Sequence, residues 1–174
     1  MPQAASAPEL ARYADAVTTP WLNPAEERAW RALQLLQLRL EAEMARDLQR
    51  SSDLTYAEYL VLVALTGAER DALRLHELAT MLSWETSRTS HQVARMTRRG
   101  LLDRRTSAQD RRGCEVSATD RGRAAIEAAA PAHLAAVRRL FFDHLSADEV
   151  AAIGDAAAKV LEATDPPGDL HHVG

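Results

Sequence analysis

The 174-residue chain has one cysteine, few aromatic residues (5%) and no long apolar run. A lone Cys114 cannot form a disulfide within the chain, and no Cys/His cluster has the spacing of a zinc site. No stretch approaches the roughly 18 apolar residues that a membrane-spanning helix needs, and the chain does not begin with a secretory leader. We therefore expect a cytoplasmic protein with no metal, other cofactor or membrane partner, in which Cys114 has a structural role.

Short motifs of the common enzyme classes are also missing. We find no G-x-G-x-x-G after a strand, no G-x-x-x-x-G-K-S/T, no H-E-x-x-H and no G-x-S-x-G. His133 and His144 would lie on one helix but about 16 Å apart along its axis, which is too far to share a metal ion. We expect no catalytic residues and no enzyme activity.

Positive charge is concentrated in one part of this acidic chain. The formal net charge is −4, yet residues 84–112 contain eight arginines and three acids, a local charge of +5. A basic region on an acidic protein is typical of a surface that meets a polyanion such as double-stranded DNA.

Two short helices with a tight turn between them are predicted in and just before this region. The apolar spacing in residues 75–82 indicates the first helix, and the second covers residues 86–99, with Thr89, Val93 and Met96 facing a core. Residues 83–85 leave room only for a tight turn, which is the spacing of a helix-turn-helix. Gly100 is a natural end for the second helix, because glycine adopts the left-handed conformation at little cost.

The other face of the second helix is polar and basic. A row of arginines can enter a major groove about 12 Å wide and donate two bonds to guanine, while Ser and Gln bind phosphates or base edges. For the helix taken alone, an ordinary solvated face is the alternative. We predict that DNA is contacted by Ser87, Arg88, Ser90, His91, Gln92, Arg95 and Arg98.

Two strand-like runs follow, at residues 101–105 and 114–118, joined by a polar segment that contains Asp110, Arg111 and Arg112. A hairpin in this position is a wing. Arginines at its tip would be attracted by the negative potential of a narrow minor groove. A turn with solvated arginines is the alternative for the segment taken alone.

Helix-capping pairs mark the remaining elements, and they are Asn23 with Glu26, Thr55 with Glu58, and Ser146 with Glu149. They predict helices over about 23–50, 55–66 and 146–164. The alanine-rich stretch 119–145 predicts one more helix, which Pro131 should kink or interrupt. The fold class is therefore mainly α with a small β-hairpin wing (α+β).

The sequence divides into an N-terminal arm at 1–22, partly helical, a single domain at 23–164 and a flexible tail at 165–174. The winged helix-turn-helix would cover about 55–119, flanked by dimerisation helices at about 23–50 and 119–164. These flanking helices carry more apolar residues than a small winged helix can bury. The residues are Trp30, Leu33, Leu134, Val137, Phe141, Val150, Ile153, Val160 and Leu161.

In combination, these features resemble the MarR family of bacterial winged helix-turn-helix regulators over roughly residues 23–163. The helix-turn-helix residues 78–79, 82 and 99–102 look like the family's. Ala118 departs from the family's usual leucine, which puts the local packing of the wing in question. The family's wing pattern is matched by Asp110, Arg112, Val116, Thr119 and Gly122.

The resemblance implies a homodimer that binds a pseudo-palindromic operator, more often as a repressor, and is released by a small-molecule effector, often an aromatic acid. Asp110 and Arg112 would brace the wing, and Arg111 or Arg112 would enter the minor groove. Effector-site candidates are Trp30, Arg74 and His76. A winged helix used only for protein contacts is the alternative function.

Overall fold

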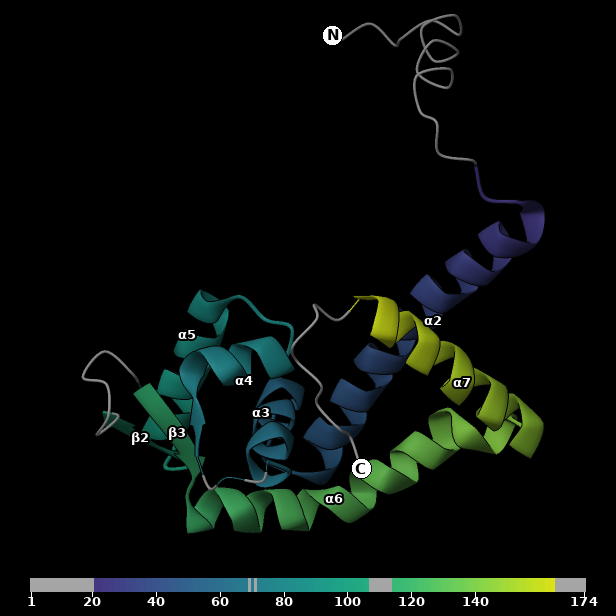
Figure 1. Cartoon of the computed structure of the whole chain (residues 1–174). Helices are drawn as coiled ribbons and strands as arrows, with labels where there is room; N and C mark the ends of the chain where they lie inside the picture. Colours follow the sequence, from purple (N-terminus) through teal and green to yellow (C-terminus); the bar gives the residue numbers. More distant parts are fainter. Residues whose placement is uncertain (1–20, 69, 71, 107–113, 165–174) are drawn as a thin grey trace, which may run out of the picture. The chain divides into compact units, whose positions relative to one another are not determined.

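The computed structural model describes residues 21–68, 70, 72–106 and 114–164, and it shows helices with one small antiparallel sheet (Figure 1). The mainly α fold class with a small β wing is confirmed. The chain divides into two units, Met1–Arg39 and Leu40–Gly174, and each is considered by itself. Within the described ranges, no helix is long and apolar enough to cross a membrane.

Helix α2 (Pro24–Ser51) begins where its capping residue predicts. The Asn23 Oδ1 accepts hydrogen bonds from the backbone N–H groups of Ala25 (2.9 Å) and Glu26 (3.0 Å), and Glu26 Oε2 accepts from the Asn23 N–H (2.8 Å). In the first unit, α2 exposes large apolar side chains, including Trp30 and Leu33. In the second unit, the part of α2 after Arg39 buries apolar side chains.

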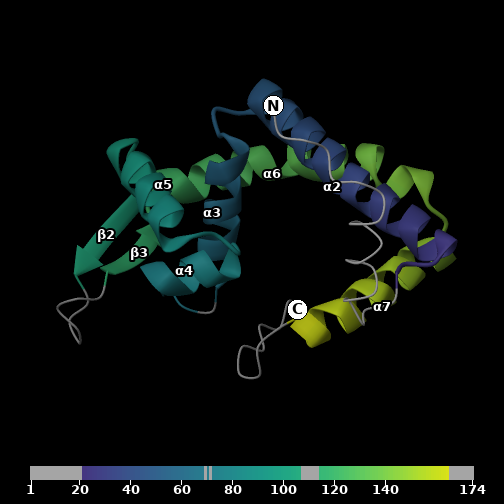
Figure 2. The same ribbon diagram turned by 90° about the horizontal axis from the view of Figure 1, so that it is seen from above.

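Helix α3 (Tyr56–Thr66) is the centre of the second unit. It contacts helices α4 (Leu75–Met81), α5 (Thr86–Arg98) and α6 (Asp120–Leu140), and Figures 1 and 2 both show it between α4 and α6. The Thr55–Glu58 capping box that begins α3 is formed. The core around α3 includes Leu62, Leu78, Val93, Met96 and Leu102.

The sheet has the order β1–β3–β2 and all its pairs are antiparallel. Strands β2 (Leu102–Thr106) and β3 (Cys114–Ala118) match the predicted hairpin within one residue. Strand β1 (Leu73–Arg74) was not predicted, because two residues carry no period that a sequence pattern can reveal. It pairs Leu73 with Val116 and so makes β3 the central strand.

The helix predicted at 119–145 forms, but it ends earlier than expected. Helix α6 stops at Leu140, and the 3-10 turn η1 (Phe142–His144) leads to α7 (Ala147–Thr164). Helix α6 continues through Pro131, whose missing N–H interrupts the backbone hydrogen bonding at one position, as predicted, without ending the helix. The predicted Ser146–Glu149 cap is formed, and α7 has no buried residue.

Two side-chain contacts fasten α6 to its neighbours in the second unit. The Asp47 carboxylate on α2 accepts hydrogen bonds from Arg50 (2.9 Å) and Arg139 (2.8 Å), and these bonds hold its pKa below the ordinary value. The His133 ring lies 4.3 Å from the Tyr59 ring, centroid to centroid. Burial lowers the pKa of His133, an effect that the nearby Asp47 opposes.

The start of α6 is clasped to the end of α5. Thr119 donates from its hydroxyl to the Gly100 carbonyl (2.7 Å) and from its backbone to the Leu101 carbonyl (3.1 Å). Its Oγ1 also accepts the Gly122 N–H (3.0 Å). A Cβ on Gly122 would lie 2.2 Å from the Leu101 carbonyl oxygen and 3.2 Å from Leu62 Cδ2. This close backbone approach explains why glycine follows three residues after the threonine.

We predict that Gly122→Ala lowers the free energy of unfolding by about 2–3 kcal/mol, because the added methyl group overpacks the clasp. Helix propensity alone would give the opposite sign, since alanine is favoured over glycine by about 1 kcal/mol. The control is Ala124→Gly, an exposed position on the same helix, where a loss of about 1 kcal/mol is expected. Urea unfolding followed by circular dichroism measures both, and a stabilised Gly122→Ala would contradict the clasp.

Candidate nucleic-acid interface

Helix α5 has one buried face and one exposed basic face. Thr89, Val93 and Met96 are each 0% exposed, as the helical period predicts. Ser90 is half-buried. The exposed residues of the opposite face are Ser87, Arg88, His91, Arg95 and Arg98. The last four of these, with Ala57 of α3, line a shallow hollow of about 510 Å³. The structure therefore brings most of the predicted DNA-contact residues onto one surface.

Gln92 does not share this exposure. It is 4% exposed, its Oε1 accepts a hydrogen bond from Arg95 Nη2, and its Nε2 has no partner among the described residues. Gln92 is nearly buried but also lines the hollow, where it accepts from Arg95, and its direct DNA contact stays a prediction. The spacing of Thr89, Gln92, Val93 and Met96 is the i, i+3, i+4, i+7 pattern of a buried stripe, and it carried this information.

The turn between α4 and α5 is built on a left-handed residue. Ser83 has φ +51°, and the following Trp84 N–H donates to the Ala79 carbonyl (2.9 Å), while the Ser83 N–H donates to Thr80 (2.9 Å). This is the Schellman arrangement that closes a helix. It leads directly to Trp84, whose ring centroid lies 4.2 Å from the Arg88 guanidinium carbon.

Helix α5 ends by the same device. Gly100 has φ +70°, the Gly100 N–H donates to the Thr97 carbonyl (2.9 Å), and the Leu101 N–H donates to Met96 (3.0 Å). Leu101 is 2% exposed, so the chain leaves the helix straight into the core. The predicted role of Gly100 is confirmed by its left-handed backbone.

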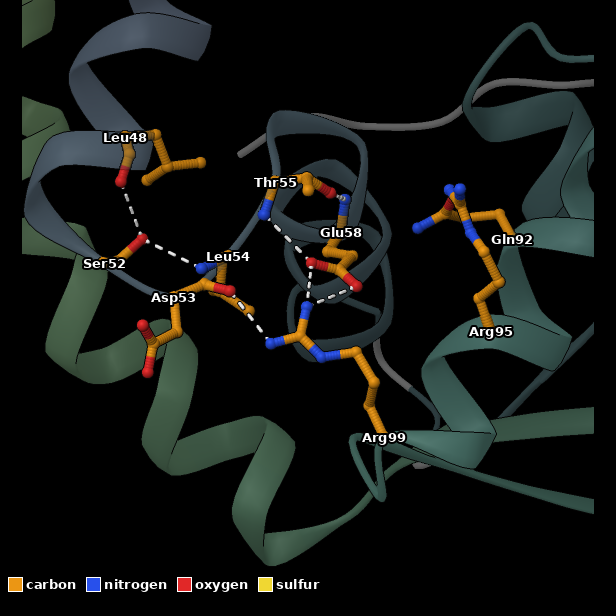
Figure 3. Close-up of polar contacts among 9 residues, drawn as sticks. All are labelled: Leu48, Ser52, Asp53, Leu54, Thr55, Glu58, Gln92, Arg95 and Arg99. Carbon is orange, nitrogen blue, oxygen red and sulfur yellow. Dashed lines mark hydrogen bonds and ion pairs between the residues drawn. The ribbon is translucent and has the colours of Figure 1, made fainter.

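A buried carboxylate fixes the end of α5 to the start of α3 (Figure 3). Arg99 Nη1 donates to both Glu58 oxygens (2.7 and 2.6 Å), and Arg99 Nη2 donates to the Asp53 carbonyl (2.9 Å). Glu58 Oε2 also accepts the Thr55 N–H of the capping box (2.9 Å). The Glu58 side chain is 5% exposed and that of Arg99 is 39% exposed. Arg99 is therefore engaged within the protein, whereas the side chain of its neighbour Arg98 is exposed and has no ion pair or hydrogen bond among the described residues.

The rest of the basic region lies on and beyond the sheet. Arg104 and Arg105 of β2 are exposed, and Arg104 Nε donates to the half-buried Cys114 Sγ on β3 (3.2 Å). This contact joins the two strands of the hairpin through the Cys114 side chain. The predicted wing residues Asp110, Arg111 and Arg112 lie outside the described residues, and their roles remain predictions.

The three effector-site candidates occupy different settings. Trp30 is exposed on α2 in the first unit, and His76 is exposed on α4. Arg74 is half-buried at the start of α4, where its backbone N–H donates to Glu77 Oε2 (2.7 Å). Their role in effector binding stays a prediction.

Another hollow, of about 350 Å³, lies beside α5 and is not lined by any of these three candidates. Its walls come from α2 after Arg39, from α3 and from the α4–α5 turn. They include the aromatic residues Tyr56 and Trp84 and the charged residues Glu41 and Arg88. Sequence reasoning missed it because the walls meet only in the folded chain. Across the described ranges, no three His, Cys, Asp or Glu side chains are grouped so as to hold a metal ion.

A family model described as MarR family matches residues 52–113. AbsC, a MarR family transcriptional regulator from Streptomyces coelicolor, is 34% identical, with a TM-score of 0.76 over 83% of this chain and 97% of AbsC. Sco3205 from the same organism, a regulator solved in complex with DNA, is 34% identical, with a TM-score of 0.79 over 86% and 97%.

A third solved structure, BpsR from Bordetella bronchiseptica, concerns the regulation of DNA binding by 6-hydroxynicotinic acid. It is 25% identical, with a TM-score of 0.63 over 74% of this chain and 98% of BpsR. No curated protein matches the chain.

The contribution of the Glu58–Arg99 pair to folding stability can be tested without DNA. We expect Glu58→Gln to lower the free energy of unfolding by about 1–3 kcal/mol, because it leaves Arg99 without its anionic partner. This lies below the loss typical of fully buried pairs, since solvent screens the half-exposed guanidinium. Arg98→Ala removes an exposed neighbour and should change stability by less than about 0.5 kcal/mol. Equal unfolding midpoints in urea for the two variants would contradict the role of Glu58.

Proposed function

Because the chain belongs to the MarR family of transcriptional regulators, we propose that it is a homodimeric DNA-binding regulator, acting as a repressor, whose helix α5 reads a pseudo-palindromic operator. The observation that carries the proposal is the division of α5 into a fully buried stripe and an exposed row of Arg88, His91, Arg95 and Arg98. The row lies on the second helix of a helix-turn-helix, which is the helix that enters the major groove in such motifs. The similar Sco3205 was solved with DNA.

The exposed arginines of α5 can make both kinds of DNA contact, to base edges and to phosphates. A guanidinium can donate two parallel bonds to guanine O6 and N7, and it can equally bind a phosphate. Arg99 is not counted among these donors, since Glu58 and the Asp53 carbonyl occupy it. The family resemblance adds Arg111 or Arg112 in the minor groove, with Asp110 and Arg112 bracing the wing.

If α5 binds DNA as proposed, the loss of affinity on replacing an arginine depends on whether that arginine contacts a base or a phosphate. Arg95→Ala or Arg98→Ala should each weaken binding by about 1–3 kcal/mol if the residue reads a base. If it binds a phosphate, the slope of log affinity against log salt should fall by about one unit. The control is Arg46→Ala, which removes an equal charge from an exposed, Glu43-paired position on α2. Fluorescence anisotropy on a duplex that the wild-type protein enriches from random sequence measures all three.

Two outcomes would contradict this proposal. If the wild-type protein enriches no duplex and shows no salt-dependent binding to DNA, the alternative of a winged helix used for protein contacts is favoured. If the Arg95 and Arg98 variants behave like Arg46→Ala, DNA binds at another surface.

A two-fold dimer is supported by the apolar side chains that the single chain leaves in solvent. Helix α7 has no buried residue, and Ile153, Val160 and Leu161 are 44%, 62% and 58% exposed. Leu134 on α6 and Trp30 on α2 are 62% and 53% exposed. Burying these residues against a second copy would remove the exposed surface and place two α5 helices about 34 Å apart, one turn of DNA.

Removal of the segment after Leu145 tests the dimer. The full chain should be dimeric at micromolar concentration, with an interface above about 2,000 Å². The truncated chain should be monomeric and should lose operator affinity, because one winged helix reaches a single half-site. It should still fold, since α7 contributes no buried residue to the core. Light scattering after size-exclusion chromatography gives the mass. A truncated chain that stays dimeric would contradict the proposal.

We also propose that an aromatic acid is the effector and that it binds the hollow beside α5. Tyr56 and Trp84 offer ring faces, and Arg88 offers a partner for a carboxylate. The related BpsR, whose DNA binding is regulated by 6-hydroxynicotinic acid, supports a ligand of this class. An acid bound here would engage Arg88 and withdraw it from DNA, which would couple ligand binding to release.

Thermal unfolding with 6-hydroxynicotinic acid, and with its uncharged amide as control, tests this site. A ligand at 100 times its Kd stabilises the folded state by about 2.7 kcal/mol, which is readily seen as a higher Tm. We expect the acid to raise the Tm and to weaken DNA binding, and Arg88→Ala to abolish the Tm shift. A shift that survives in Arg88→Ala would place the acid elsewhere.

A further inference from the structure

The Arg88 side chain lies over an aromatic ring. Its guanidinium carbon lies 4.2 Å from the centroid of the Trp84 ring, one helical turn earlier. Trp84 is itself held in place, because it is half-buried, packs against the hydrophobic core and donates its backbone N–H to Ala79. The ring therefore forms a fixed platform beneath an exposed cation.

A cation that lies over an indole ring is held there by electrostatic attraction. The attraction comes from the negative potential of the ring face, and it is stronger where solvent is excluded. In a stacked guanidinium the flat face is covered, while the N–H donors lie in its plane and point past the ring. An arginine side chain has many rotamers, and part of this conformational entropy is lost whenever it binds. Stacking in the free protein removes some of that cost beforehand.

The position of Arg88 on α5 makes this orientation useful. It is the third residue of the helix, and the N-terminal residues of recognition helices are the ones that contact base edges. The left-handed backbone of Ser83 fixes the position of Trp84 after the turn. The Trp84 ring in turn contacts the Arg88 guanidinium.

We propose that Trp84 is a positioning residue for operator recognition, which stacks on Arg88 and presents its in-plane donors to a base edge. The inference rests on the proposed function, because Arg88 must contact DNA for Trp84 to affect recognition. It assigns no DNA contact to Trp84 itself. Trp84 acts through Arg88 and determines how strongly one base pair of the operator is preferred.

A double-mutant cycle on the full-length protein tests the assignment. The variants are Trp84→Leu, which keeps apolar volume but removes the ring, Arg88→Ala, and the two combined. Binding is measured by anisotropy on the duplex enriched by the wild type and on duplexes with single base-pair changes. We expect Trp84→Leu to weaken binding about 5- to 10-fold in the wild-type background but less than about 2-fold in the Arg88→Ala background. Both single variants should relax preference at the same base pair.

Conservative variants separate positioning from folding. Trp84→Phe keeps a π face and should retain most of the affinity and the base preference. Arg88→Lys leaves the core and the charge intact but loses the planar fork, and it should lose the preference while keeping salt-dependent binding. These readouts hold even if Trp84→Leu unfolds.

Three results would overturn the inference. Equal losses from Trp84→Leu with and without Arg88 would show that the ring acts through the fold alone. An Arg88→Lys variant with unchanged base preference would show that the planar, stacked guanidinium is not needed. A wild-type protein that enriches no duplex would overturn the proposed function itself, and this failure is distinguishable because it appears before any substitution is made.

Discussion

One buried carboxylate determines how the basic helix sits on the rest of the unit. Glu58 accepts the Thr55 N–H that begins α3, and it binds Arg99, which follows the last residue of α5, 41 positions further along the chain. The same guanidinium reaches the Asp53 carbonyl in the loop before α3. A carboxylate this deeply buried is stable because each oxygen has a partner. The pair therefore fixes the end of α5, and with it which residues of α5 face the core and which face solvent.

The exposed arginines of α5 each have different neighbours in the structure. Trp84 supports Arg88 from the turn, and the buried Gln92 holds Arg95 from within the helix interface. Arg98 is exposed one residue before the Arg99 that Glu58 binds. Neighbouring cations on one helix thus have different freedom before any partner arrives. A uniform charged stripe, as the sequence alone suggests, does not describe this surface.

Local signals in the sequence predicted most of the fold. Capping pairs placed the starts of α2, α3 and α7, and Gly100 placed the end of α5, because each depends on hydrogen bonds within a few residues. Features that depend on distant partners were missed. Strand β1 exists only because Val116 pairs with Leu73, and the Glu58–Arg99 bond spans two helices. The burial of Gln92 was missed for another reason, since its polar character was weighed above its place in the apolar period.

In the sheet of the described residues, the two edge strands are the two-residue β1 and the longer β2. With β1 on one side of β3, the outer edge of the hairpin is β2, whose residues Asp103, Arg104 and Arg105 are exposed. An uncovered strand edge is a template on which another chain can add a strand, and charged side chains along it oppose that addition. The arginines of β2 thus have a use that does not involve nucleic acid. Each of these exposed charges would have to lose water if another strand were added to this edge, so the three residues disfavour pairing through the sheet.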